Sequence, residues 1–149
     1  LGHLQKGHAI VFADLDQDGD QDILEEMGGA FPGDRYYNAC FENPGFGKNW
    51  IAIKLAGTKT NRAAIGARIH IEIEQDGVTR SIYRHVNSGG TFGGNPFQQN
   101  IGLGKVEKIR LLEIEWPVSN EKQQFRNLDV NQTISITEGA DEITSIPRK

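Results

Sequence analysis

Apolar and polar residues alternate along most of the chain in short runs, which Gly, Pro, Asn or Asp residues separate. Alternation with a period of two predicts half-buried β-strands, because successive side chains of a strand point to opposite faces. No long run shows the period of a helix, so the pattern predicts an all-β protein of about eight or nine strands. We expect the main strands at residues 8–13, 35–42, 50–55, 67–75, 78–86, 109–116, 125–128 and 133–138.

The clearest hairpin is expected around the Asp-Gly pair at residues 76–77, a strong two-residue turn signal. On the strand before it, isoleucines alternate with charged or polar residues, which predicts one buried and one wet face. Counting outward from the turn places Ile71 opposite Ile82. The same register puts Arg80 and Arg84 on the isoleucine face, and a longer loop or a bulge would remove them from it. The register therefore stays open at this point.

Length and charge narrow the class of protein. The chain has 149 residues, enough for one sizeable core, and 16 basic against 20 acidic residues give a net charge of −4. This balance argues against nucleic acid as a partner, and no stretch approaches the roughly 20 apolar residues of a membrane span. A single cysteine, Cys40, excludes an internal disulfide. Since the chain opens on Leu1 without a signal-like segment, we expect a piece of a longer protein.

The strongest chemical signal is an acidic loop at residues 14–22, which reads DLDQDGDQD. Its alternate carboxylates repel one another, and a hard cation relieves that repulsion, since calcium takes six to eight oxygen ligands. Gly19 permits the positive φ that turns the backbone, so that the Asp20 carbonyl can also face the ion. The competing interpretation is a solvated acidic turn. The predicted calcium ligands are Asp14, Asp16, Asp18, Asp20 and Asp22.

Glu25 stands twelfth counting from Asp14, so the loop also satisfies the EF-hand pattern. We reject an EF-hand because glycines and β-branched residues before Asp14 make a poor entering helix. The usually apolar eighth position is Gln21, and the apolar pair falls at residues 23–24, after the last aspartate. A strand–loop–strand arrangement is therefore predicted.

The run HAIVFADLDQDGDQDIL at residues 8–24 resembles an FG-GAP repeat of the VCBS type, the calcium-loop unit of integrin-like β-propellers. The resemblance implies that residues 1–47 are the last blade, or part of it, of a propeller lying upstream, because a propeller needs about four to eight blades. It assigns calcium to the same five aspartates.

The rest of the chain resembles the ASPIC/UnbV domain, which follows such repeats in cartilage acidic protein-like and bacterial secreted proteins. Residues 48–139 are expected to form this domain, as a C-terminal β-sandwich or barrel-like fold, and residues 140–149 a tail. The matching stretches are NWI at 49–51, LAGTKTNR at 55–62, IGARI at 65–69, SGG at 88–90, IGLG at 101–104, EWP at 115–117 and NQ at 131–132.

Four further residues are candidate ligand contacts. Asn61, Arg62 and Arg68 could recognise a carboxylate or a sugar hydroxyl, although such residues also cap turns or lie on wet faces. Phe92 lies between two glycine pairs that could bring the backbone close to a ligand, or form a turn. No catalytic residue is predicted, since no nucleophile, base or paired carboxylates stand in a credible relation.

The resemblance implies a calcium-binding, non-catalytic recognition or adhesion module at the C-terminus of a larger secreted protein. Its location would be extracellular or periplasmic, and its partner an extracellular protein or glycan. The alternative is an accessory carbohydrate-binding module of a secreted polysaccharide-acting enzyme. An upstream catalytic pair would favour the enzyme, whereas further Asp-x-Asp-x-Asp-Gly motifs alone would favour a binding propeller.

Overall fold

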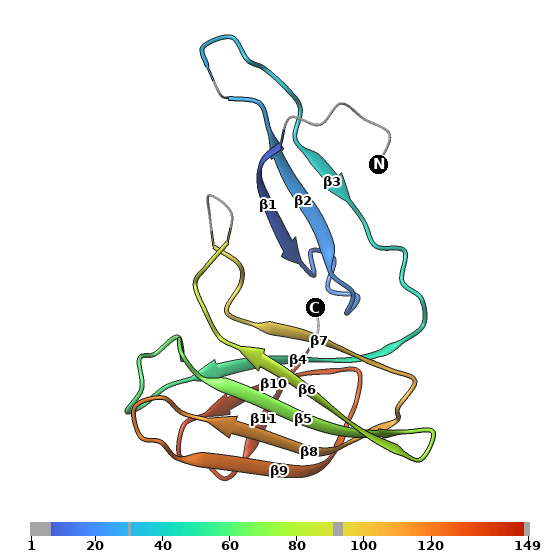
Figure 1. Cartoon of the computed structure of the whole chain (residues 1–149), viewed down its shortest axis with the longest axis vertical. Helices are drawn as coiled ribbons and strands as arrows, with labels where there is room; N and C mark the ends of the chain where they lie inside the picture. The colour runs from blue at the N-terminus through green and yellow to red at the C-terminus, as the bar shows by residue number, and fades with distance from the viewer. Residues whose placement is uncertain (1–6, 30, 91–93, 148–149) are drawn as a thin grey trace.

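The computed structural model describes residues 7–29, 31–90 and 94–147 (Figure 1). Within these residues every regular element is a strand, as predicted. A helix long and apolar enough to cross a membrane is absent from the same residues. The strands are β1 (Gly7–Ala13), β2 (Asp22–Met27), β3 (Ala39–Phe41), β4 (Asn49–Ala56), β5 (Arg68–Gln75), β6 (Val78–His85), β7 (Gln99–Gly104), β8 (Lys108–Glu115), β9 (Lys122–Asp129), β10 (Gln132–Thr137) and β11 (Ile143–Ile146).

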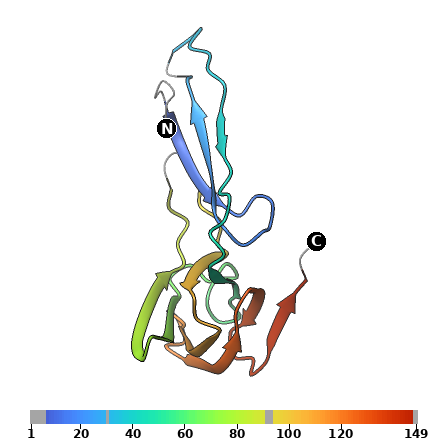
Figure 2. The ribbon, with the colours of Figure 1, turned by 90° about the vertical axis from the view of Figure 1, so that its right-hand side faces the viewer.

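The strands form one 3-stranded sheet and two 4-stranded sheets, with strand orders β1-β2-β3, β11-β10-β4-β7 and β6-β5-β8-β9. The two larger sheets face each other across an apolar core and form a sandwich (Figures 1 and 2). No sheet of the described residues closes into a barrel, which decides between the two architectures expected from the sequence. The N-terminal sheet extends away from the sandwich (Figure 2).

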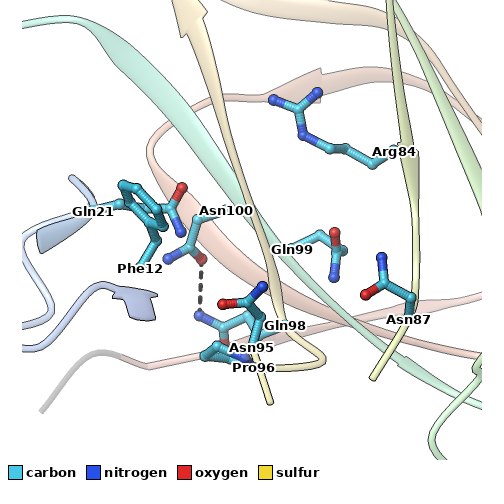
Figure 3. A pocket seen from close by; sticks show the side chains of 9 residues that line it. All are labelled: Phe12, Gln21, Arg84, Asn87, Asn95, Pro96, Gln98, Gln99 and Asn100. Atoms are coloured by element: carbon cyan, nitrogen blue, oxygen red, sulfur yellow. Dashed lines mark hydrogen bonds between the residues drawn. The ribbon is translucent and has the colours of Figure 1, made fainter. Parts of the chain in front are cut away.

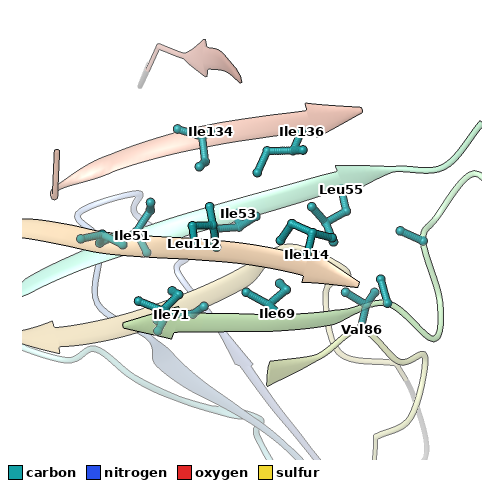
Figure 4. Packing of buried hydrophobic residues seen from close by; sticks show 14 of the residues in the cluster. Ile51, Ile53, Leu55, Ile69, Ile71, Val86, Leu112, Ile114, Ile134 and Ile136 are labelled. Carbon is teal, nitrogen blue, oxygen red and sulfur yellow. The ribbon is translucent and has the colours of Figure 1, made fainter. Parts of the chain in front are cut away.

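The sandwich core is built from the alternating isoleucines and leucines of both sheets (Figure 4). Ile69, Ile71 and Ile73 of β5 are fully buried, as their alternation predicts. Figure 4 shows Ile69 and Ile71 on the side of the core opposite Ile51 and Ile53 of β4. Every residue of this core lies at position 51 or later in the chain. The N-terminal sheet therefore contributes nothing to it.

The β5–β6 hairpin adopts the simple register of the two-residue turn. Ile71 pairs with Ile82, and the turn residues Asp76 and Gly77 take left-handed φ angles of 52° and 75°. Arg80 stays on the isoleucine face without being buried because β6 is an edge strand. Its Nη2 reaches across the open edge of the sandwich and donates to the Leu103 carbonyl of β7 at 3.1 Å.

One strand pair is parallel. β10 runs beside β4 with Ile134 opposite Ile53, whereas the other paired strands of the described chain are antiparallel. Asn131 fixes the start of this pairing, because its Oδ1 accepts from the Trp50 N–H at 3.1 Å. Its own N–H donates to the Trp50 carbonyl at 2.7 Å. Two of the stretches that carry the ASPIC/UnbV resemblance thus meet in space.

The side-chain amide of Gln123, on β9, forms hydrogen bonds that connect the two sheets of the sandwich next to Trp116. The Trp116 indole is fully buried, and its Nε1 donates to Oε1 of Gln123. Nε2 of Gln123 donates to the carbonyls of Thr137 at 3.1 Å and Ala140 at 2.7 Å, while Oε1 also accepts from Gly139 N at 3.2 Å. One side-chain amide therefore satisfies polar groups of two sheets at once.

The C-terminal segment differs from the prediction of a tail at residues 140–149. β11 pairs antiparallel with β10, and Ile143 packs against the core. The strand has 4 residues with isoleucine at positions 143 and 146. Two apolar residues three positions apart give no alternation, so no local pattern predicts this strand.

The N-terminal sheet leaves apolar side chains exposed on a single layer. Ile10 is 37% exposed, Phe12 44% and Leu24 41%, whereas the isoleucines of the sandwich core are at 0–1%. Among the described residues, the N-terminal sheet therefore has no core of its own.

We expect a truncated chain beginning at Lys48 to fold alone and to unfold in one cooperative transition in urea, monitored by circular dichroism. A peptide of residues 1–47 is expected to stay unfolded. A molten 48–149 chain would show that the N-terminal sheet belongs to the core.

Candidate metal centre

The acidic loop joins β1 to β2. β1 ends at Ala13 and β2 begins at Asp22, which confirms the strand–loop–strand prediction, and no helix flanks the loop among the described residues. Gly19 has a φ of 105°, as predicted, and Gln17 also takes a left-handed φ of 63°. These two residues let the loop fold back tightly on itself.

Three of the five aspartates come together. Asp14, Asp16 and Asp18 each place one carboxylate oxygen within 4.8 Å of the others. Backbone groups orient them, because Asp18 N donates to Asp16 Oδ1 at 3.1 Å and Gly19 N donates to Asp14 Oδ2 at 3.2 Å. Asp20 N donates to Asp18 Oδ1 at 2.9 Å. The alternate spacing and the tight turn thus aim three carboxylates at one point.

Asp20 and Asp22 lie outside this group of three. Asp22 is 3% exposed and holds the base of the loop, since its two oxygens accept from Leu15 N at 3.0 Å and Asn43 N at 2.9 Å. Asp20 lies against Gly45, where an added Cβ would come within 2.8 Å of its Oδ2. The structure thus gives Asp22 an anchoring role that its place in the motif does not reveal.

The loop fits a hard divalent cation on the chemistry of its donors. Carboxylates crowded within 4.8 Å repel one another unless a cation lies between them. All three donors are oxygens, which suit calcium or magnesium, whereas zinc prefers nitrogen and sulfur. Calcium tolerates six to eight oxygens in irregular geometry, so water and loop carbonyls can complete a shell that Asp14, Asp16 and Asp18 begin.

The four candidate ligand contacts do not form one site. Asn61 caps its own turn, since its side chain donates to the Ile65 carbonyl at 2.8 Å and accepts from Ile65 N at 2.9 Å. Arg62 lines a hollow beside Lys54 of β4. Arg68 lines a separate hollow formed with the end of β6. Phe92 lies outside the described residues.

Glu138 was missed by the sequence analysis, although it organises the loop that carries Asn61 and Arg62. Its carboxylate is 3% exposed, and Oε2 accepts from the backbone N–H groups of Thr58, Lys59 and Thr60 at 2.7–2.8 Å. Oε1 accepts from the hydroxyls of Thr60 at 3.0 Å and Ser119 at 2.7 Å. A signal did exist, because Glu138 shares the phase of the buried residues Ile134 and Ile136.

These hydrogen bonds control the ionisation of Glu138. Burial of the carboxyl raises its pKa, but the bonds from the backbone of Thr60, the Ser119 hydroxyl and the backbone of Thr58 outweigh burial and lower the pKa to about 2. Glu138 is therefore a charged, buried anchor for residues 57–62.

A search of curated proteins finds no match to the chain. The family model described as ASPIC and UnbV matches residues 57–143, more than half of the 149 residues. The match runs from the loop after β4 to the first residue of β11, and so includes Glu138 and the loop it holds. The acidic loop lies outside the matched range. The chain therefore belongs to the ASPIC and UnbV family.

Proposed function

We propose that this protein is a calcium-binding, non-catalytic recognition or adhesion module at the C-terminus of a larger secreted protein, extracellular or periplasmic. The convergence of Asp14, Asp16 and Asp18 within 4.8 Å is the observation that carries the proposal. The resemblance of residues 8–24 to an FG-GAP repeat supports it. On this view the N-terminal sheet is the last blade of an upstream propeller, which would cover its exposed apolar faces.

The proposed role of calcium is structural. The loop connects β1 to β2. At the end of the loop, the carboxylate of Asp22 accepts a hydrogen bond from the backbone N–H of Asn43, which lies on the segment between β3 and β4. A cation at Asp14 would therefore stiffen the path between the sheet and the sandwich. Exposed extracellular sites of this kind suit the millimolar calcium outside cells.

A non-catalytic role is supported by the arrangement of the titratable groups. His70 Nε2 lies 3.1 Å from Ser81 Oγ, the kind of contact that activates a serine. However, Glu72 lies 4.0 Å from the same nitrogen, so it cannot orient the ring from its other side as a relay requires. The imidazole is also stacked on the Tyr83 ring, with centroids 4.6 Å apart. The role that these contacts support for His70 is a cross-strand packing pair with Tyr83 on the β5–β6 hairpin.

Calcium is expected to raise the thermal stability of the protein. At a free concentration of about 100 times the dissociation constant, the gain is about 2.7 kcal/mol in the free energy of unfolding. Asp14→Ala should nearly abolish this gain and Asp18→Ala should weaken it. Magnesium should do much less, because it requires a rigid octahedron at about 2.0–2.1 Å. Titration calorimetry and the melting temperature at increasing calcium measure both effects.

Two variants serve as controls for the calcium titration. Glu25→Ala should leave the calcium response unchanged, because this residue lies within β2, beyond the loop. Asp129→Asn removes an exposed carboxylate of the sandwich and should also change nothing. The absence of heat and of a thermal shift at millimolar calcium would refute the site. A large effect of Glu25→Ala would favour an EF-hand type of coordination.

A further inference from the structure

A hollow lies over the outer side of the sheet that contains β4, β10 and β11. Its volume is about 680 Å³, within the range of about 300–1,000 Å³ typical of small-ligand sites. Lys54 and Ser135 are partners in the parallel β4–β10 pairing, and both point away from the core because their neighbours Ile53 and Ile134 point into it. The lining also includes Arg62, Phe97, Gln98 and Ile146.

The charge of this hollow is opposite to that of the protein. Lys54 and Arg62 line it, and no carboxylate does so among the described residues. Neither cation forms an ion pair or a side-chain hydrogen bond with the described part of the chain. Two uncompensated cations in a chain with a net charge of −4 create a local positive potential that favours an anion. The planar guanidinium of Arg62 suits a carboxylate in particular.

The remaining walls suit a sugar ring. The Phe97 ring is 43% exposed and, with Ile146, offers an apolar surface for the C–H face of a pyranose. Ser135 can donate and accept hydrogen bonds. Nε2 of Gln98 donates to Asn100 Oδ1 at 3.0 Å, which directs its amide while Oε1 can accept from a hydroxyl.

We propose that this hollow binds an acidic saccharide, with Lys54 and Arg62 contacting the carboxylate of a uronic acid unit. The inference rests on the proposed recognition function and specifies its ligand. Phe97 and Ile146 pack against the ring, and Gln98 and Ser135 exchange hydrogen bonds with its hydroxyls. An acidic peptide would use the two cations but not the pairing of a flat apolar wall with amide and hydroxyl groups.

A second, smaller hollow meets the first at Gln98 and extends the site (Figure 3). It holds about 240 Å³ and lies where Phe12 of β1 and Gln21 of the acidic loop face the sandwich. Amide side chains dominate its lining, and Figure 3 shows Asn87 and Gln99 directed into the same space. Amides both donate and accept, so this space suits the hydroxyls of a neighbouring sugar, and Arg84 in the lining offers further donors.

The test is a titration of the full chain with D-glucuronate, followed by the backbone amide shifts of the ¹⁵N-labelled protein. D-glucose, which lacks the carboxylate, should bind at least about tenfold more weakly, because it cannot form the charge-assisted hydrogen bonds to Lys54 and Arg62. Lys54→Gln and Arg62→Gln should each weaken glucuronate binding by a similar factor. Arg110→Gln, at an exposed arginine of β8 that lines neither hollow, is the matched control and should have no effect.

Several results would overturn the site. Equal binding of glucose and glucuronate would show that the two cations do not contribute to binding. Equal losses in Arg62→Gln and Arg110→Gln would place the binding site elsewhere. Tighter binding of a hexaglutamate peptide than of glucuronate would identify a peptide site. Running each titration with calcium and with EDTA separates the two proposals. Calcium binding without glucuronate binding refutes this site alone, whereas glucuronate binding without calcium binding refutes the metal centre alone.

Discussion

Replacing Glu138 with alanine is expected to lower the free energy of unfolding by about 3–4 kcal/mol, measured by urea denaturation of the wild type and the variant at pH 7. The change removes the acceptor of three backbone N–H groups and two hydroxyls. Hydrogen bonds to a charged acceptor contribute about 1.5–3 kcal/mol each. Water can replace the acceptor at the exposed Thr58 and Lys59, but not readily at Thr60, which is 4% exposed.

Glu138→Gln distinguishes the contribution of the negative charge to stability from that of a hydrogen-bond acceptor of the same size. The amide oxygen can still accept from the backbone of residues 58–60, and the hydroxyls of Thr60 and Ser119 can rotate to accept from the amide N–H₂. We therefore expect a smaller loss of about 1–2 kcal/mol, the difference between charged and neutral hydrogen bonds. Equal losses in the alanine and glutamine variants would assign the whole effect to charge.

The pH dependence of stability follows from the same residue. Its pKa is lowered from 4.5 to about 2 in the folded protein, so the stabilisation is complete above about pH 4.5. It is lost as the pH falls from 4.5 toward 2, where the folded state must take up the proton that the unfolded chain already carries. The urea midpoint of the wild type should therefore fall in this window, and that of Glu138→Gln should fall less. Parallel curves would contradict the assignment.

Trp116→Ala is expected to destabilise the sandwich by about 3–5 kcal/mol, the usual range for removing a large buried aromatic side chain. Trp116 is fully buried, and its backbone also closes the turn before β9, since its N–H donates to the Glu121 carbonyl at 3.0 Å. The variant leaves a cavity and also removes the indole N–H that Gln123 accepts. Thermal and urea unfolding measure the loss.

Trp116→Phe and Gln123→Ala divide this effect into its parts. Phenylalanine keeps most of the apolar contact but lacks the N–H donor. Gln123→Ala removes the hydrogen-bond donor of the Thr137 and Ala140 carbonyls. It also removes the acceptor of the Trp116 indole N–H. The double variant should lose less than the sum of the single losses, because both break one hydrogen-bonded network. Strict additivity would show that Trp116 acts through packing alone.

Local patterns predicted the elements that depend on neighbouring residues. The alternation of Ile69, Ile71 and Ile73 and the Asp-Gly turn defined the β5–β6 hairpin, and the spacing of the aspartates defined the acidic loop. β11 and the parallel β4–β10 pair were not predictable in this way, because they depend on partners distant in sequence. Glu138 was missed for a related reason. Its charge suggests a surface position, whereas its backbone donors come from a loop 78–80 residues earlier.

The candidate ligand site also combines a residue that the sequence identified with one that depends on contacts between distant parts of the chain. Arg62 was identified as a candidate contact, whereas Lys54 carried no signal beyond its place in the predicted strand at residues 50–55. Their shared hollow arises because the chain turns back after β4 and the segment before β7 lies beside it. Such proximity has no signature in a single sequence.

The parallel β4–β10 pair has a consequence for how the protein is made. Thr58, just after β4, and Glu138, just after β10, are 80 residues apart in the chain. At a synthesis rate of about 5–20 residues per second, β10 follows β4 from the ribosome by about 4–16 s. During that interval the edge of β4 that β10 later covers has no partner strand, although β7 can already pair with the other edge. This edge of β4 is therefore open to pairing with strands of other chains until β10 emerges.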